Sequence, residues 1–192
     1  MVGPFHVGPV AVLVPVKAFR NAKVRLAPAL PPDERTALAR MMADGVLRAA
    51  HGLFTAVACD DPEVAAWAID RGAVVAWTPG LGLNGAVARG VEELATLGAE
   101  RVIVAHADLP LADDLRPVAA FDGVTLVPDR HNDGTNVMCV PCSSGFEFSY
   151  GPGSFRRHQA QAHARGLPLR VAAIPTLAWD VDVPDDLSYA GT

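Results

Sequence analysis

The run Val12-Leu13-Val14-Pro15-Val16-Lys17 is short and apolar, and it ends on the first of four cations that fall within nine residues. The other three cations are Arg20, Lys23 and Arg25. We expect a buried β-strand over residues 10–16, with the cations directly after it. Cations at the end of a strand suit a polyphosphate, because Arg and Lys both match phosphate oxygens. A solvated basic loop would show the same pattern, so this segment alone leaves both interpretations open.

Strand-like and helix-like patterns alternate along the rest of the chain. Short apolar runs predict strands, and apolar residues at helical spacing predict helices. Asn84 as an N-cap and Gly98 as a C-cap support the ends of one helix. The alternation predicts an α/β fold with a mostly parallel sheet and helices on both faces. The expected strands are 54–59, 73–77, 101–105, 124–127, 136–140 and 169–174, and the expected helices are 33–50, 62–70, 84–97, 111–120 (interrupted by Pro117) and 155–165.

Composition narrows the classes of protein to which the chain can belong. Its 192 residues are 51% hydrophobic with a formal net charge of −5, which predicts one domain over residues 1–192 with a sizeable core. The acidic balance argues against a nucleic-acid partner, because such proteins usually present a basic face. No apolar run reaches the length of a membrane span, and residues 1–6 lack the features of a signal peptide. We therefore expect a cytoplasmic protein with no membrane partner.

The chain has three cysteines, which do not make a disulfide framework. Two of them stand in Cys139-Val140-Pro141-Cys142, which has the spacing of a redox or zinc motif. A zinc site would need a second pair, and a redox motif should open a helix, whereas this motif ends a strand-like run. We expect structural thiols.

In parallel sheets ligands bind beyond the carboxyl ends of the strands, so residues at those ends are candidates for chemistry. His106-Ala107-Asp108-Leu109-Pro110 directly follows one expected strand. Asp108 is a natural Mg²⁺ ligand there, because Mg²⁺ takes one or two protein carboxylates together with phosphate oxygens. The alternative role for Asp108 is to cap the next turn.

A second acidic group lies in Trp179-Asp180-Val181-Asp182-Val183-Pro184. In an extended segment Asp180 and Asp182 point to one face, since the strand period is two. Two carboxylates on one face repel each other unless a cation or water compensates, which favours a metal site. Alternatively Asp182 caps a helix that begins at Pro184, and both roles can hold together if Asp180 binds the metal.

Gly151-Pro152-Gly153-Ser154 opens an expected helix and is a candidate anion site. Backbone N–H groups are free at a helix start, and the Ser154 hydroxyl adds a donor. A simple Ser N-cap is the alternative. The polar segment 129–136 follows another strand. It is either part of a binding site or only a turn. His158 and His163 are five residues apart, which is wrong for a helical metal pair, so we expect surface or structural histidines.

Eight segments, taken in order, resemble the motifs of one enzyme family: Pro15-Val16-Lys17, Ala22-Lys23-Val24-Arg25-Leu26, Gly82-Leu83-Asn84-Gly85-Ala86, Ala107-Asp108-Leu109-Pro110, Pro128-Asp129-Arg130, Asp133-Gly134-Thr135-Asn136, Phe148-Ser149-Tyr150-Gly151-Pro152-Gly153-Ser154-Phe155 and Asp180-Val181-Asp182-Val183-Pro184-Asp185-Asp186-Leu187. The family is that of the 2-phospho-L-lactate guanylyltransferases, called phosphoenolpyruvate guanylyltransferases in their bacterial branch. These enzymes make the phosphate-bridged precursor of the deazaflavin coenzyme F-420. The resemblance spans nearly the whole chain, and the ordered set is more specific than any single motif.

The resemblance implies a Rossmann-like nucleotidyltransferase fold of the GT-A-like type, which is a three-layer sandwich. It also implies GTP as donor, Mg²⁺ as cofactor, and a downstream transferase that accepts the unstable product; the oligomeric state, including a homodimer, stays open. The implied site residues are Lys17, Lys23 and Arg25 for the triphosphate and for catalysis, Asn84 for the nucleoside, Asp108 with Asp180 or Asp182 for the metal, and Thr135, Gly151 and Ser154 for the small phosphorylated acid.

Two departures from the family pattern affect the first motif. Val24 stands where the family usually has Ser, which removes one hydroxyl contact. The glycine-rich first loop of sugar nucleotidyltransferases is also absent. Fewer backbone amides then reach the phosphates, which shifts phosphate binding onto the cations.

The resemblance implies in-line attack by a phosphate oxygen of the acid on the α-phosphorus of GTP, giving a diphospho-guanosine product and pyrophosphate. A phosphate monoester is already ionised at neutral pH, so no general base is required. Phosphoenolpyruvate is favoured over 2-phospho-L-lactate and 3-phosphoglycerate only because the chain resembles the bacterial branch. Other interpretations are a nucleotidyltransferase acting on molybdopterin or a sugar phosphate, a metal-dependent glycosyltransferase using the D-x-D of Asp180-Val181-Asp182, and a non-catalytic nucleotide sensor.

Overall fold

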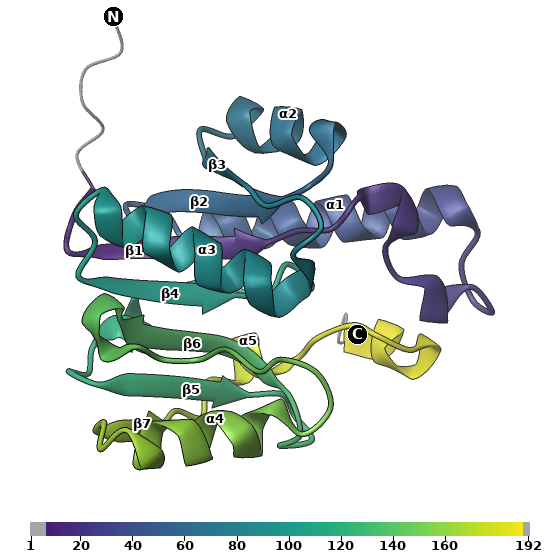
Figure 1. Cartoon of the computed structure of the whole chain (residues 1–192). Helices are drawn as coiled ribbons and strands as arrows, with labels where there is room; N and C mark the ends of the chain where they lie inside the picture. The colour runs from purple at the N-terminus through teal and green to yellow at the C-terminus, as the bar shows by residue number, and fades with distance from the viewer. Residues whose placement is uncertain (1–6, 190–192) are drawn as a thin grey trace, which may run out of the picture.

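The computed structural model describes residues 7–189, and the strands in that range form one seven-stranded sheet (Figure 1). The strands are β1 Val10–Pro15, β2 Phe54–Cys59, β3 Val74–Trp77, β4 Arg101–Ala105, β5 Val124–Pro128, β6 Thr135–Pro141 and β7 Leu169–Val171. Their order is β3-β2-β1-β4-β6-β5-β7. The expectations for residues 1–6 and 190–192 lie outside the described range.

The sheet is mostly parallel, as predicted. β1 pairs in parallel with β2 and with β4, β2 pairs in parallel with β3, and β5 with β7. The exception is β6, which runs antiparallel to both of its neighbours, β4 and β5. The amino end of β6 therefore lies beside the carboxyl end of β4, at the edge where ligands bind in sheets of this kind.

Helices cover both faces of the sheet, which gives three layers (Figure 1). One face carries α1 (Pro32–Ala49) and α2 (Pro62–Asp70), and the other carries α3 (Gly82–Thr96) and α4 (Ser154–Ala164). None of the helices between residues 7 and 189 has the length and apolar character that crossing a membrane demands. The short helices are η1 Phe19–Asn21, η2 Val24–Leu26, η3 Arg116–Ala119, η4 Cys142–Ser144, α5 Pro175–Ala178 and η5 Pro184–Tyr189.

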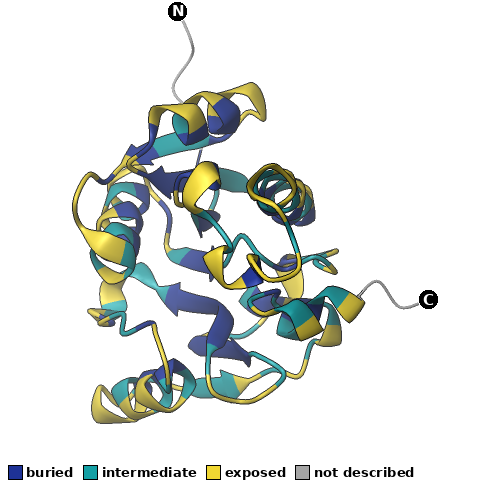
Figure 2. Cartoon of the chain, turned by 90° about the vertical axis from the view of Figure 1, so that its right-hand side faces the viewer, coloured by how far each residue is buried: buried dark blue, intermediate teal, exposed yellow. Residues whose placement is uncertain are grey.

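The alternation of side chains along the strands builds a separate core on each face. In β1, Val12 and Val14 join the core under α1 and α2, whereas Ala11 and Leu13 join the core under α3 and α4. Figure 2 shows the central strands as the continuous buried part of the molecule. A strand buried on both faces reads as an unbroken apolar run, which is why β1 could be predicted.

The helix expected over 111–120 is wrong; only η3 forms there. The Oδ1 atom of Asp114 accepts a 2.9 Å hydrogen bond from the backbone N–H of Arg116. Local side-chain bonds of this kind compete with helix formation. Pro117 then removes a further backbone donor inside the segment.

Two other element ends differ from expectation. Asn84 does not cap α3, which begins two residues earlier, at Gly82. β7 ends at Val171 instead of residue 174, because the chain turns there toward α5, which opens on Pro175. Every other expected strand and helix ends within one residue of its prediction.

The three cysteines are free thiols at three points of the fold. Burial raises the pKa of the Cys139 thiol, in the middle of β6, to about 11, and burial also raises the pKa of Cys142. A thiol with a raised pKa is a poor nucleophile and a poor metal ligand at neutral pH. Both observations fit the structural role that the sequence predicts.

The close packing of α3 on β1 depends on Gly90. A Cβ atom at this position would lie 2.7 Å from both Cδ atoms of Leu13, whose side chain is fully buried. We expect Gly90→Ala to lower the free energy of unfolding by about 1–3 kcal/mol, because the crowded core has no room to relax. Urea unfolding monitored by circular dichroism measures the change.

Gly45 in α1 provides the matched control for Gly90. A Cβ atom there would meet only the Arg48 guanidinium, at 3.7 Å. Gly45→Ala should therefore raise stability by about 0.5–1 kcal/mol, as alanine normally does inside a helix. Equal effects of the two substitutions would contradict the packing explanation.

Candidate functional site

A cleft of about 660 Å³ opens beyond the carboxyl ends of β1 and β4 and the amino end of β6. The loop after β1, with η1 and η2, forms one wall of this cleft. The start of α4 and the acidic segment after α5 line it as well. The structure brings together nine of the ten residues that the sequence singles out: Lys17, Lys23, Arg25, Asp108, Thr135, Gly151, Ser154, Asp180 and Asp182.

The tenth residue, Asn84, is not part of the cleft lining. Its side-chain oxygen accepts a 2.7 Å hydrogen bond from the backbone N–H of Tyr150. Asn84 thus ties the start of α3 to the segment that leads into Gly151. Its neighbour Leu83 does line the cleft.

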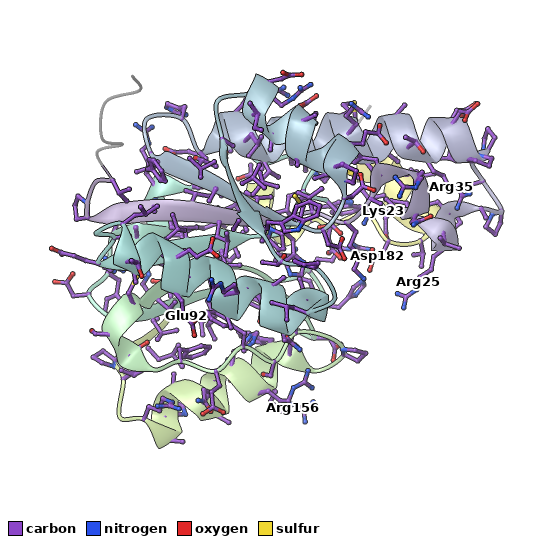
Figure 3. All side chains as sticks on the ribbon, turned by 45° about the horizontal axis from the view of Figure 1, so that its top comes forward. Lys23, Arg25, Arg35, Glu92, Arg156 and Asp182 are labelled. Atoms are coloured by element: carbon purple, nitrogen blue, oxygen red, sulfur yellow. The ribbon has the colours of Figure 1, made fainter. Side chains whose placement is uncertain are left out.

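Lys23 is the ionic centre of the cleft. Its Nζ lies 2.6 Å from Oδ2 of Asp108 and 3.0 Å from Oδ1 of Asp182, although these carboxylates come from segments far apart in sequence. Figure 3 shows Lys23 beside Asp182, with Arg25 further out. The backbone of Lys23 has a left-handed φ of 55°, which is costly for a residue with a side chain. Local strain of this kind gathers at functional sites.

The charges in the cleft shift one another's protonation. Burial alone would lower the pKa of Lys23, but Asp108 and then Asp182 raise it above its usual range. Burial alone would raise the pKa of Asp108, but the Lys23 ammonium holds it below the usual range. The pKa of Asp180 is raised, first by burial and then by the carboxylates of Asp108 and Asp182. The three carboxylates therefore carry more negative charge than Lys23 alone balances.

The carboxylates fit a divalent cation. Oδ1 of Asp108 is buried and has no hydrogen-bond partner among the described residues, so it is free to bind a ligand. Asp180 lies close enough for its pKa to be raised by Asp108. Within residues 7–189 no group of three or more His, Cys, Asp or Glu forms a complete metal site. Mg²⁺ needs no such group, because it binds through one or two carboxylates plus phosphate oxygens and water.

The other cations after β1 differ in their partners. Lys17 lines the cleft and pairs with no carboxylate in the described part of the chain, and Arg25 lies 3.7 Å from Asp182 with most of its side chain exposed. Arg20 does not line the cleft; it lies 2.6 Å from the N-cap carboxylate of α2, Asp61. Three of the four cations therefore face the cleft, and Arg20 joins the loop to α2.

Two hydroxyls, of Thr135 and Ser154, line the part of the cleft at the starts of β6 and α4. The N-cap of α4 is Gly153, so the alternative role of Ser154 as a simple N-cap is wrong. The Ser154 hydroxyl instead accepts a 3.1 Å hydrogen bond from the backbone N–H of Thr135. Both side chains are almost fully buried. Gly151 has a φ of 113°, a conformation that favours glycine.

Two residues shape the acidic segment, Arg130 and Asp186; sequence reasoning missed the role of Arg130 and the backbone contacts of Asp186. The buried carboxylate of Asp186 accepts hydrogen bonds from the backbone N–H groups of Asp182 (2.6 Å) and Val183 (2.8 Å), and Arg130 pairs with it. The alternative role of Asp182 as a helix cap is therefore wrong, because Asp186 accepts the hydrogen bonds at the start of η5 and Asp182 faces Lys23. The signal was present: an acidic residue at the third helical position often bonds back to the helix start.

Of the two roles expected for the histidines, surface and structural, His158 takes the structural one and His163 lies on the surface. The side chain of His158 is fully buried, and burial, followed by the charges of Arg157 and His106, lowers its pKa to about 4. The unfolded chain takes up a proton as the pH falls through about 6.5, whereas the folded chain does not until about pH 4. Stability contributed by neutral His158 is thus lost over this window as the pH falls.

We expect the free energy of unfolding to fall by about 2 kcal/mol between pH 7 and pH 5 on account of His158. Urea unfolding at the two pH values measures this fall. His158→Gln should remove most of it, whereas His163→Gln, at an exposed position of the same helix, should leave it in place. An unchanged pH dependence in His158→Gln would contradict the assignment.

Comparison with known proteins shows the family to which the chain is similar. The sequence model of a family described as "Guanylyl transferase CofC like" matches residues 10–189. A phosphoenolpyruvate guanylyltransferase of Sphaerobacter thermophilus is 41% identical over 184 residues, covering 91% of this chain and 89% of the relative. Another, of Conexibacter woesei, is 41% identical over 187 residues, covering 91% of this chain and 84% of the relative.

Solved structures show the same fold at low sequence identity. A candidate nucleotide-diphospho-sugar transferase from Desulfovibrio desulfuricans G20 has a TM-score of 0.75 at 16% identity, covering 96% of this chain and 87% of that one. A CMP:2-keto-3-deoxy-manno-octonic acid synthetase complexed with CTP has a TM-score of 0.60 at 14% identity, covering 95% and 97%. These likenesses confirm the predicted nucleotidyltransferase-like α/β fold.

Proposed function

The chain belongs to the CofC-like guanylyl transferase family, and from this premise we propose that it joins GTP to a small phosphorylated carboxylic acid. It is a nucleotidyltransferase; the donor, the acceptor and the roles of single residues are the proposal. One observation carries it: a single cleft combines three cations, five carboxylates and two buried hydroxyls at the edge of the sheet where ligands bind. This composition suits two anionic substrates that must be held together.

The two sides of the cleft suggest which substrate binds where. Lys17, Lys23 and Arg25 follow β1, and their charges suit the triphosphate of GTP. Thr135, Ser154 and the backbone at Gly151 offer uncharged hydrogen-bonding groups, which suit the carboxylate and phosphate of a small acid. The nearby carboxylates of Asp129 and Asp133 already accept hydrogen bonds from the backbone N–H groups of Gly134 and Gly153. The start of α4 adds the positive end of a helix dipole on that side.

The chemistry needs alignment more than proton transfer. The bond that forms joins a phosphate oxygen of the acid to the α-phosphorus of GTP. The bond that breaks joins this phosphorus to the oxygen bridging to the β-phosphate, and pyrophosphate leaves with the electron pair. The attacking oxygen is already ionised at neutral pH. The cations lower the repulsion between the two anions and stabilise the charge on the leaving group.

Asp108, together with Asp180 or Asp182, would hold Mg²⁺. When bound, the ion would neutralise phosphate charge and orient the reacting groups. The buried, unpartnered Oδ1 of Asp108 supports this role. Lys23 supports it as well, because a cation that already bridges Asp108 and Asp182 shows that the carboxylates attract positive charge.

We propose phosphoenolpyruvate as the acceptor and the precursor of coenzyme F-420 as the destination of the product. The support is the name of two relatives, which are phosphoenolpyruvate guanylyltransferases 41% identical to this chain over most of its length. Phosphoenolpyruvate and 2-phospho-L-lactate differ by little around one carbon atom, so their discrimination depends on pocket geometry.

The decisive experiment supplies the purified chain with GTP, Mg²⁺ and one acid at a time, and measures pyrophosphate release. Mass spectrometry identifies the product. Turnover with phosphoenolpyruvate, giving the diphospho-guanosine ester, supports the proposal. Turnover only with a sugar phosphate or molybdopterin would show that the proposed acceptor is wrong and that this compound is the acceptor. GTP binding without pyrophosphate release from any acceptor would overturn the proposed reaction.

A further inference from the structure

His158 lies beneath the acid side of the cleft, and both of its ring nitrogens are hydrogen-bonded. Nε2 lies 3.0 Å from the backbone nitrogen of Ser149, and Nδ1 lies 3.0 Å from the Thr135 hydroxyl oxygen. The ring is fully buried against Phe146 and Tyr150, whose ring centroids lie 5.7 Å and 5.0 Å away. His158 itself is not part of the cleft lining.

The partner of Nε2 decides which tautomer the ring adopts. A backbone N–H can only donate, so Nε2 must accept the bond from Ser149. A neutral imidazole carries its single proton on the other nitrogen. Nδ1 therefore carries the proton and donates it to Oγ1 of Thr135.

The direction of this bond fixes the Thr135 hydroxyl. Since Oγ1 accepts from His158, the hydroxyl proton of Thr135 must point elsewhere, and no acceptor for it lies among the described residues. The same holds for the hydroxyl of Ser154. The Ser154 hydroxyl accepts from the N–H of Thr135, and its own proton has no acceptor in that part of the chain. Both residues line the cleft.

We propose that His158 is a positioning residue that makes Thr135 a hydrogen-bond donor toward an anionic oxygen of the acceptor acid. This inference deepens the proposed function and rests on it. Without the donation from His158, the Thr135 hydroxyl could turn and offer its lone pairs, which a carboxylate or phosphate oxygen repels. His158 thus acts on the acid through Thr135 and has no contact with the nucleotide side of the cleft.

The surroundings of His158 keep the ring in the neutral form that this role requires. The charged or titratable side chains that act on it are Arg157 on its own helix and His106 after β4, and no carboxylate is among them. Burial and these two groups lower the pKa of His158 to about 4. The tautomer is therefore the same throughout the neutral pH range.

Two substitutions separate the two hydrogen bonds of the ring. An asparagine carries its amide close to the position of Nδ1, so His158→Asn can still donate to Thr135. A glutamine carries its amide close to Nε2, so His158→Gln keeps the bond from Ser149 and loses the donation. We expect His158→Gln to raise the KM for phosphoenolpyruvate by about 10–100-fold, the cost of one hydrogen bond to a charged group. The KM for GTP should stay within about twofold.

The Asn variant and a double substitution distinguish positioning from a merely structural role. His158→Asn should keep the KM for the acid within about threefold of the unaltered protein. In a Thr135→Val background, His158→Gln should add nothing further, because the hydroxyl through which it acts is gone. Equal losses in Asn and Gln variants, additive losses with Thr135→Val, or a matching rise in the KM for GTP would overturn the proposal.

A spectroscopic measurement tests the inference separately from the proposed reaction. The ¹⁵N chemical shifts of the His158 ring report which nitrogen carries the proton, with or without substrate. We expect a protonated Nδ1 and an unprotonated Nε2 at pH 7. The opposite tautomer would overturn the positioning role even if phosphoenolpyruvate is the substrate. The expected tautomer with no turnover of any acid would instead point to a failure of the proposed reaction.

Discussion

Replacing Asp108 with Asn is expected to lower the rate of pyrophosphate release by about 100–1,000-fold, the loss typical of removing one electrostatic contact to a transition state. The amide keeps the shape of the carboxyl group but loses its charge. It would therefore bind Mg²⁺ poorly, and Lys23 would lose its closest partner, at 2.6 Å. Steady-state assays at saturating GTP and acid, over a range of Mg²⁺ concentrations, measure the loss.

Asp113→Asn is the matched control for Asp108→Asn. This carboxylate lies a few residues further along and accepts a 2.8 Å hydrogen bond from the Thr176 hydroxyl, on the exposed surface away from the cleft lining. Its removal should change the rate less than twofold, as expected for a surface substitution. Mg²⁺-dependent turnover that survives in Asp108→Asn would refute the metal assignment, provided the melting temperature shows an intact fold.

Replacing Lys23 with Met should lower activity by about 100-fold and should also change how the protein responds to metal alone. Lys23 bridges Asp108 and Asp182, so its loss leaves Asp108 without an ion-pair partner and Asp182 with only the more distant Arg25. We expect the metal-free variant to lose about 1–3 kcal/mol of the free energy of unfolding. This is less than the usual cost of breaking a buried ion pair, because Asp182 is half exposed.

Added Mg²⁺ should stabilise Lys23→Met more than the unaltered protein. In the unaltered protein the ion must compete with the Lys23 ammonium, whereas in the variant it meets unpaired carboxylates. Thermal unfolding with increasing Mg²⁺ and no nucleotide measures this difference. Arg89→Met, which removes an exposed cation paired with Glu93 on α3, is the control and should show the metal response of the unaltered protein. A smaller response in Lys23→Met would contradict the shared position of lysine and metal.

The sequence predicted the fold well where the signal is local. β2 and β4 coincide with their predicted ranges, because each is a short apolar run bounded by turns. α2 does so too, since Asp61 and Pro62 mark its start. The antiparallel direction of β6 could not be predicted in this way. Strand direction depends on which strand becomes the neighbour, and the residues of β6 are equally apolar in either direction.

The site was predicted as a set of residues but not as a set of contacts. The sequence alone shows that cations follow one strand and a carboxylate follows another. Lys23 and Asp108 could therefore be expected at the same edge of the sheet. Their partners come from distant segments, however. The choice between an anion site and a helix cap for Ser154 stayed open, because its hydroxyl bonds to Thr135, nineteen residues away. The hydrogen bonds of His158 could not be predicted for the same reason, since Ser149 and Thr135 contact its ring only in the folded chain.

Because β6 runs antiparallel to β4, the residues proposed to bind the nucleotide and those proposed to bind the acid come from two different stretches of the chain. The nucleotide side is supplied by residues up to Asp108, whereas the acid side is supplied by the stretch that begins at Thr135 and ends in α4. The two stretches pair along the β4–β6 seam, and the hydrogen bond from the backbone N–H of Tyr150 to Asn84 adds a further link between them. The second stretch can therefore change to bind a new acid while the phosphate-binding residues of the first stretch stay the same. A chimaera joined at this seam would take its donor specificity from one parent and its acceptor specificity from the other.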